Sequence, residues 1–224
     1  MGYTVLADTD SRSTNQIDTD TFPAIEAYIS EQKGRKDEDR YIHVSEREGR
    51  TAIFGIKQGI IKHIHDVRAL DCDTTFMPVL GETNLYEIKG WMAGINKGIS
   101  CFQPSLSELL FSYVPEVTLG RVWMKLHDRR AFQFVWEELL SLVKHLTNKT
   151  LGFVSLHRGG TLLGVNADME AAPLLGMADA LLSTIDLPSV AEKVKDAARV
   201  LKRNVHICYS HVKRFVLSME FWPP

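Results

Sequence analysis

The chain has 224 residues, of which 45% are hydrophobic, and a formal net charge of −2 at pH 7. This length can bury a core as one domain, and the small net charge excludes a protein that coats nucleic acid through bulk positive charge. Three cysteines are too few for a disulfide framework. Because no apolar leader and no run of about 18 apolar residues occurs, we expect a soluble, intracellular protein with no membrane partner.

The N-terminal part is expected to precede the main core. A mobile acidic and polar arm, a lead-in and a core are predicted over residues 1–20, 21–66 and 67–224. The lead-in should begin with a helix that ends in a charged loop at residues 32–36. Two short strands at 40–46 and 51–56 and a helical turn at 59–65 should follow.

The core should begin with a β-hairpin. Residues 70–79 form an apolar and β-branched run, residues 80–84 have turn chemistry, and residues 85–93 alternate with aromatic side chains. Asp71 and Asp73 lie two residues apart in the first strand, so they should project from the same face. Carboxylates in a strand need compensation for lost hydration, which a divalent metal ion can supply.

Alternating helices and strands are predicted for the remainder. The helix at 131–146 has one apolar stripe, which we interpret as core and not as a cofactor site. The other predicted strands are 117–126, 151–156, 161–166 and 205–208, and the other predicted helices are 106–113, 171–182, 190–201 and 211–219. We therefore expect an α/β fold, with a mixed central sheet flanked by helices and no interior domain boundary.

A second acid, Asp168, follows the predicted strand 161–166. If that strand lies beside the one that carries Asp73, the two carboxylates can share divalent ions. The alternative stays open that Asp168 is a helix N-cap and that Asp71 or Asp73 is a turn residue.

Two further patterns have a functional and a simpler interpretation. Cys208 and His211 form a C-x-x-H pair, but structural zinc takes four ligands, and only Cys101, His157 and His206 could add to it. The simpler interpretation is a buried cysteine and a capping histidine. The basic stretch 193–214 could contact phosphates or be a solvated helix face.

Common nucleotide-binding and hydrolase motifs are missing. The sequence contains no Gly-x-x-x-x-Gly-Lys loop, dinucleotide fingerprint, G-x-S-x-G elbow or H-E-x-x-H pair. This excludes the commonest nucleotide-binding and hydrolase classes.

Three separated segments together resemble the Mutator-like (MULE-type) DDE transposases. D-T-T-F at 73–76 with the strand at 85–88 is similar to the D-x-T-F hairpin of that family, and residues 165–171 resemble its second acidic strand. Residues 206–214 resemble its C-x-x-H segment. The stretch 156–161 resembles transposon-derived proteins of mushroom-forming fungi.

The resemblance implies an RNase H-like core that cleaves and transfers DNA strands. Asp73 and Asp168 would be the first two catalytic acids and would hold two Mg²⁺ or Mn²⁺ ions, while Cys208 and His211 would match the C-x-x-H pair and could bind Zn²⁺. DNA would be the partner and the nucleus the location.

Two departures from the family pattern limit this expectation. Glu220 is too close to His211 to match the third acid, and the family's N-terminal zinc-finger-type domain is missing. We expect a transposable-element core truncated at its C-terminus, with weakened metal binding and no strand transfer, whose exposed apolar surface allows a homo-oligomer. The alternatives are a non-catalytic DNA- or protein-binding remnant that keeps the fold, and an unrelated α/β protein with chance matches.

Overall fold

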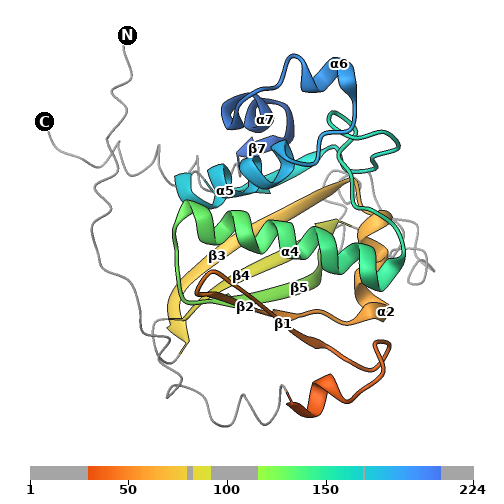
Figure 1. Cartoon of the computed structure of the whole chain (residues 1–224), viewed down its shortest axis with the longest axis vertical. Coiled ribbons are helices and arrows are strands. Elements are labelled where there is room, and N and C mark those ends of the chain that lie inside the picture. Colours follow the sequence, from red (N-terminus) through yellow and green to blue (C-terminus); the bar gives the residue numbers. More distant parts are fainter. Residues whose placement is uncertain (1–29, 80–82, 92–115, 169, 208–224) are drawn as a thin grey trace, which may run out of the picture.

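The computed structural model describes residues 30–79, 83–91, 116–168 and 170–207 (Figure 1). The described residues form a seven-stranded mixed sheet with helices packed on it, which confirms the predicted α/β class. The strands are β1 (Ile42–Arg47), β2 (Arg50–Gly55), β3 (Ala69–Val79), β4 (Thr83–Trp91), β5 (Glu116–Met124), β6 (Gly164–Ala167) and β7 (Val205–Ile207). The helices are α2 (Gln58–Ile61), the 3₁₀ turn η2 (Lys62–His65), α4 (Arg129–Thr147), α5 (Ala171–Leu182), α6 (Pro188–Ala191) and α7 (Ala197–Asn204).

The strand order across the sheet is β1-β2-β5-β4-β3-β6-β7. The neighbours from β1 to β3 are antiparallel, whereas β6 is parallel to β3 and β7 is parallel to β6. The predicted hairpin is confirmed as β3 and β4, and the two predicted lead-in strands, β1 and β2, extend the same sheet. Because β3 and β6 are parallel, they run in the same direction, and β6 ends with Ala167 opposite Cys72 while β3 continues to Val79.

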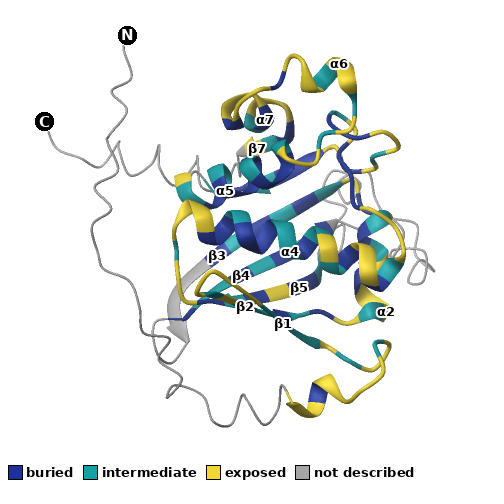
Figure 2. Cartoon of the chain, viewed as in Figure 1, coloured by how far each residue is buried: buried dark blue, intermediate teal, exposed yellow. Residues whose placement is uncertain are grey.

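Helix α4 covers the sheet and lies beside α5 (Figure 1). It begins where the side chain of Asp128 accepts a hydrogen bond from the Ala131 amide at 2.7 Å, and it ends at Asn148 in the left-handed conformation. Its apolar stripe is buried, with Phe132 and Trp136 fully inaccessible, and Figure 2 shows this buried side turned inward. The predicted helix and its role in the core are confirmed.

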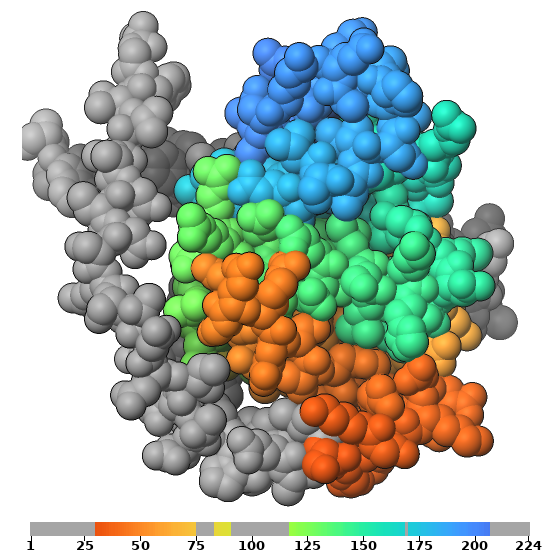
Figure 3. Space-filling model, in the orientation of Figure 1, coloured from red at the N-terminus to blue at the C-terminus, as the bar shows by residue number. Residues whose placement is uncertain are grey.

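The first described segment packs on the same helix. Figure 3 shows residues 30–57 in contact with the surface of α4. Ser45 donates a hydrogen bond to Glu138 at 2.8 Å, and His145 contacts Asp37 at 3.0 Å. These bonds join the N-terminal hairpin to the layer of helices.

The predicted strand at 151–156 is wrong. The chain folds back on itself there, and only the pair Phe153 and Leu162 forms an isolated bridge. The Val154 amide donates to the Leu162 carbonyl at 2.8 Å, and the Leu162 amide donates to the Gly152 carbonyl at 3.0 Å. Leu151, Phe153 and Leu156 are buried in a compact loop, so the apolar pattern of this segment did not indicate a strand of the sheet.

The predicted continuous helix at 190–201 is also wrong, because it is two short helices. Helix α6 ends at Ala191, and α7 begins after Asp196, whose side chain accepts the Arg199 amide at 2.9 Å. An aspartate that caps a new helix inside an apolar periodic run breaks that run in two.

Other predictions lie outside the described residues. They are the arm at 1–20 and the helices at 106–113 and 211–219. Within the described ranges, no helix has the length and apolar character needed to cross a membrane.

Candidate functional site

The two predicted catalytic acids each follow a residue that the sheet pairs with its counterpart on the neighbouring strand. In the parallel pair of β3 and β6, Asp71 is opposite Asn166 and Cys72 is opposite Ala167. Asp73 and Asp168 are the next residue of each chain segment, and neighbouring strands lie about 5 Å apart. The strand pairing thus brings the backbone that precedes Asp168 beside the part of β3 that carries Asp73, and β3 continues beyond it to Val79.

The alternation of β3 separates its polar and apolar side chains. Cys72 and Thr74 are buried, whereas Asp71 and Asp73 are partly exposed. This confirms that the two aspartates share a face, and it excludes the alternative that either is a turn residue, because both lie inside β3.

Two of the three carboxylates on this face have partners on neighbouring strands. Glu87 accepts a hydrogen bond from Arg121 at 2.7 Å and lies 3.8 Å from the ammonium of Lys89. Burial raises the pKa of Asp71, while a hydrogen bond with Asn166 and the charge of Lys89 oppose that rise. The protein itself therefore compensates Glu87 through an ion pair and compensates Asp71 in part.

Asp73 differs from both. Its cross-strand neighbour is Glu87, which carries the same charge. Within the described part of the chain, the side chain of Asp73 forms no hydrogen bond or ion pair. A partly buried carboxylate without a cation is costly, and its oxygens are the hard donors that Mg²⁺ or Mn²⁺ prefers. The donor chemistry at Asp73 therefore fits a divalent cation.

Asp168 lines a small pocket below the start of α5. Cys72, Thr74, Tyr86 and Glu170 are among the other lining residues. The residue that caps α5 by position is Glu170, so the alternative that Asp168 is the N-cap is wrong. Cys72 and Thr74 alternate with Asp73 along β3, so the pocket that they line with Asp168 is on the opposite face of that strand from the Asp73 side chain.

Glu170 and His127 form an ion pair beside Asp168, and sequence reasoning did not single them out. His127 Nδ1 lies 3.3 Å from Glu170 Oε1. Burial raises the pKa of Glu170, the charge of His127 lowers it, and the charge of Asp168 raises it. Glu170 lies two residues after Asp168 in the sequence, and this spacing was the signal that could have identified it.

The floor of the pocket is structural. Burial raises the pKa of Cys72 to about 12, and its thiol has a hydrogen bond with Tyr86. The Tyr86 hydroxyl accepts a hydrogen bond from Trp136 Nε1 at 3.3 Å. A thiol that stays protonated and buried is not a nucleophile, so Cys72 supports the site by packing.

The predicted zinc ligands are not brought together within the described residues. Cys208, His211 and Cys101 lie outside those residues. His157 accepts the Phe153 amide hydrogen at Nδ1, at 2.9 Å, and contacts Thr184 through Nε2 at 3.0 Å, so both ring nitrogens are used by the fold. No cluster of three or more His, Cys, Asp or Glu side chains suited to a metal ion occurs in the described ranges.

The basic stretch is described as far as Ile207. Lys202 and Arg203 are exposed in the last turn of α7, and Arg199 contacts Asp196 at 3.3 Å. This surface has the charge needed to contact phosphates, and it is also a solvated helix face, so both predicted interpretations remain.

Comparisons with known proteins give no family. A scan against protein-family models and searches of curated proteins and of solved structures found no match. The functional argument therefore depends on the site itself.

Proposed function

We propose that the chain is an RNase H-like core of the Mutator-like transposase type, in which Asp73 and Asp168 bind divalent metal ions for DNA strand cleavage. The observation that carries this proposal is the register of β3 and β6, in which Cys72 and Ala167, the residues immediately before the two acids, are paired. The lack of a hydrogen bond or ion pair for Asp73 among the described residues supports it.

The topology is a second support. The strands β5-β4-β3-β6-β7 combine a three-stranded antiparallel part with two parallel strands beyond β3. This is the order expected of an RNase H-like sheet, in which β3 is the first strand of the unit and β6 the fourth. The acids of the resembled family fall on these same two elements.

The residues of this chain would act as ligands and as a positioning frame. Asp73 and Asp168 would hold Mg²⁺ or Mn²⁺, and the pairing of Glu87 with Arg121 fixes a neighbouring carboxylate away from that role. When bound, two such ions activate a water or a 3′-hydroxyl and stabilise the leaving oxygen. Exposed lysine and arginine side chains of α7 would contact the DNA backbone. Zinc binding at Cys208 and His211 and a nuclear location belong to the same proposal.

A second candidate function is binding of DNA without catalysis. The two acids that match the resembled family follow a paired position of β3 and β6, but no third acid in the family's position was identified. The basic surface of α7 does not depend on the metal site. A DNA-binding remnant would therefore bind DNA through the basic surface of α7 and would not cleave DNA strands.

Titration of the purified chain with Mn²⁺ by calorimetry tests the first proposal. We expect Asp73→Asn and Asp168→Asn each to weaken binding at least about tenfold, because each removes a charged ligand. Asp71→Asn should retain binding, since Asp71 is already engaged by Asn166 and Lys89. Asp66→Asn, an exposed change before the start of β3, is the matched control.

Two outcomes would reject the metal site. One is unchanged Mn²⁺ binding in both variants, and the other is loss of binding in Asp66→Asn to the same extent.

The two candidate functions are separated by DNA assays. A salt-sensitive gel shift that a chelator does not alter supports binding alone, whereas metal-dependent nicking abolished by Asp73→Asn supports cleavage.

A further inference from the structure

A basic hollow lies far along the chain from the acid pair, in the first described segment. Arg35, Lys36, Asp39, Tyr41 and Lys57 line it. Arg35 is paired with Glu31 at 2.5 Å and Lys36 lies 3.9 Å from Glu38, which leaves Lys57 as the lining cation without an ion pair among the described residues. Tyr41 adds an aromatic ring that is 39% exposed.

The loop that carries the hollow is held by hydrogen bonds within the fold. The guanidinium of Arg40 donates to the carbonyls of Gln32, Lys33 and Arg35 at 2.9, 2.9 and 3.0 Å. The amides of Asp39 and Arg40 both donate to the carbonyl of Lys36 at 2.9 Å. The loop therefore has a defined shape before any ligand arrives.

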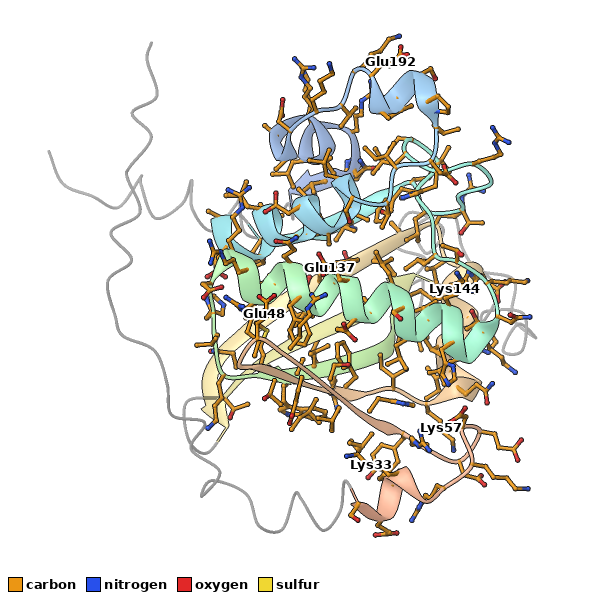
Figure 4. The ribbon with its side chains drawn as sticks, in the orientation of Figure 1. Lys33, Glu48, Lys57, Glu137, Lys144 and Glu192 are labelled. Carbon is orange, nitrogen blue, oxygen red and sulfur yellow. The ribbon has the colours of Figure 1, made fainter. Side chains whose placement is uncertain are left out.

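Another bond brings the two sides of the hollow together. The carbonyl of Tyr41 accepts the Ile56 amide at 2.8 Å, and Lys57 is the next residue. Lys57 is exposed and forms no ion pair with another described residue. Figure 4 places Lys57 at the same end of the molecule as Lys33. The ammonium group of Lys57 therefore lines the same hollow as the exposed aromatic ring of Tyr41.

We infer that this hollow binds a nucleotide unit, with its phosphate at Lys36 and Lys57 and its base against Tyr41. Lysine side chains neutralise phosphate charge, and an exposed aromatic ring can stack on any base. Asp39 can accept a hydrogen bond from a sugar hydroxyl or a base amino group. The same chemistry is presented by a free nucleotide and by a nucleotide within a single strand.

Fluorescence anisotropy with a short labelled single-stranded oligonucleotide tests this inference. The measurement is made in EDTA, so it does not depend on the proposed metal site at Asp73 and Asp168. We expect Lys57→Glu to weaken binding about tenfold and to reduce the slope of log affinity against log salt by about one. Lys62→Glu, the same charge reversal at an exposed residue that does not line the hollow, should change the affinity much less.

The aromatic part is tested with a second pair of variants. Tyr41→Ala should weaken binding by about tenfold, whereas Tyr41→Phe should retain it, because a phenyl ring still stacks on a base. Circular dichroism checks that both variants are folded.

Competition identifies the source of the nucleotide. Displacement of the labelled strand by a mononucleotide at low concentration assigns the hollow to a free nucleotide, and displacement by an unlabelled strand alone assigns it to single-stranded nucleic acid. Equal affinities of Lys57→Glu and Lys62→Glu would overturn the inference. The inference would also be overturned if Tyr41→Phe and Tyr41→Ala lost the same affinity for the oligonucleotide. It would be overturned as well if polyglutamate displaced the labelled strand as effectively as the unlabelled strand does.

Discussion

At the scale of single residues, the partners of a charged group decide what it can do. Asp71, Asp73 and Glu87 have similar chemistry and share one face of the sheet. Asn166 and Lys89 offset part of the burial of Asp71, and Arg121 pairs with Glu87. Asp73 lacks such a partner within the described residues. This difference makes Asp73 the carboxylate best suited to a metal ion.

In contrast to Asp73, the buried side chain of His157 in the 152–162 loop has partners at both ring nitrogens. Burial lowers the pKa of His157 below its usual 6.5, while the charge of Asp186 and the contacts with Phe153 and Thr184 oppose this effect. The folded protein therefore holds the neutral ring, and the Phe153 amide donates to it.

We predict that His157 makes the protein sensitive to acid. Its folded pKa is lower than its unfolded pKa, so the unfolded state takes up the proton first. The free energy of unfolding should hold above pH 6.5 and fall as the pH drops from 6.5 through the lower folded pKa. Urea unfolding on both sides of pH 6.5 measures this loss.

The variant His157→Gln should show a smaller dependence on pH, with some remaining because burial also lowers the pKa of His43 and of His65. It should also lower stability at neutral pH by about 1–3 kcal/mol if the Phe153 amide loses its acceptor. His63→Gln, at a histidine that contacts Asp66, is the comparison. An unchanged pH profile in His157→Gln would refute this role.

At the scale of elements, the contact of α4 with α5 shows why a glycine lies inside a helix. A Cβ atom added to Gly176 would lie 2.5 Å from the Arg129 carbonyl oxygen and 2.5 Å from Phe132 Cβ. The backbones of the two helices can approach this closely only without a side chain at that position. The absence of a side chain at Gly176 therefore sets how closely α5 approaches α4. Helix α5 is the element that follows Asp168 in the chain.

We predict that Gly176→Ala lowers the free energy of unfolding by about 1–3 kcal/mol, because the added methyl group forces the helices apart. Gly59→Ala is a matched control in α2, where an added Cβ meets nothing within 4 Å. That change should be neutral or stabilise by up to about 1 kcal/mol through the helix preference of alanine. Thermal unfolding measures both changes, and an equal effect of the two variants would contradict the packing argument.

At the scale of the whole molecule, β3 and β4 are in the interior of the sheet, and β1 and β7 are its edges. Interior strands have two hydrogen-bonded neighbours, and β3 and β4 also carry the fully buried Leu70 and Ile88. Edge strands have one neighbour and can open locally at a lower free energy.

Native-state hydrogen exchange should reflect this order. We expect the slowest exchange in β3, β4 and α4, and faster exchange in β1 and β7, with mass spectrometry of peptides as the measurement. Protection of β7 equal to that of β4 would contradict the described sheet order. Slow exchange in β3 would also mean that Asp73 is held on a rigid element.

Local patterns in the sequence by themselves determined several elements. The helix at 131–146 was predicted from an apolar stripe of helical period and corresponds to α4, and the hairpin of β3 and β4 follows from two alternating runs around a turn. These signals were sufficient because capping, turn chemistry and side-chain periodicity act over a few residues. The same reasoning failed at 151–156 and 190–201, where a compact loop and an internal cap replaced the regular element that the pattern predicted.

The tertiary structure alone decided which charged groups meet. The sequence identified Asp73 and Asp168 as candidates but could not place β6 beside β3, because that pairing is made between segments far apart in the chain. It also could not distinguish Asp71 from Asp73, since both have the same alternation and the same chemistry. Their difference comes from Asn166, Lys89 and Glu87 on the neighbouring strands, and those neighbours are set only by the order and register of the sheet.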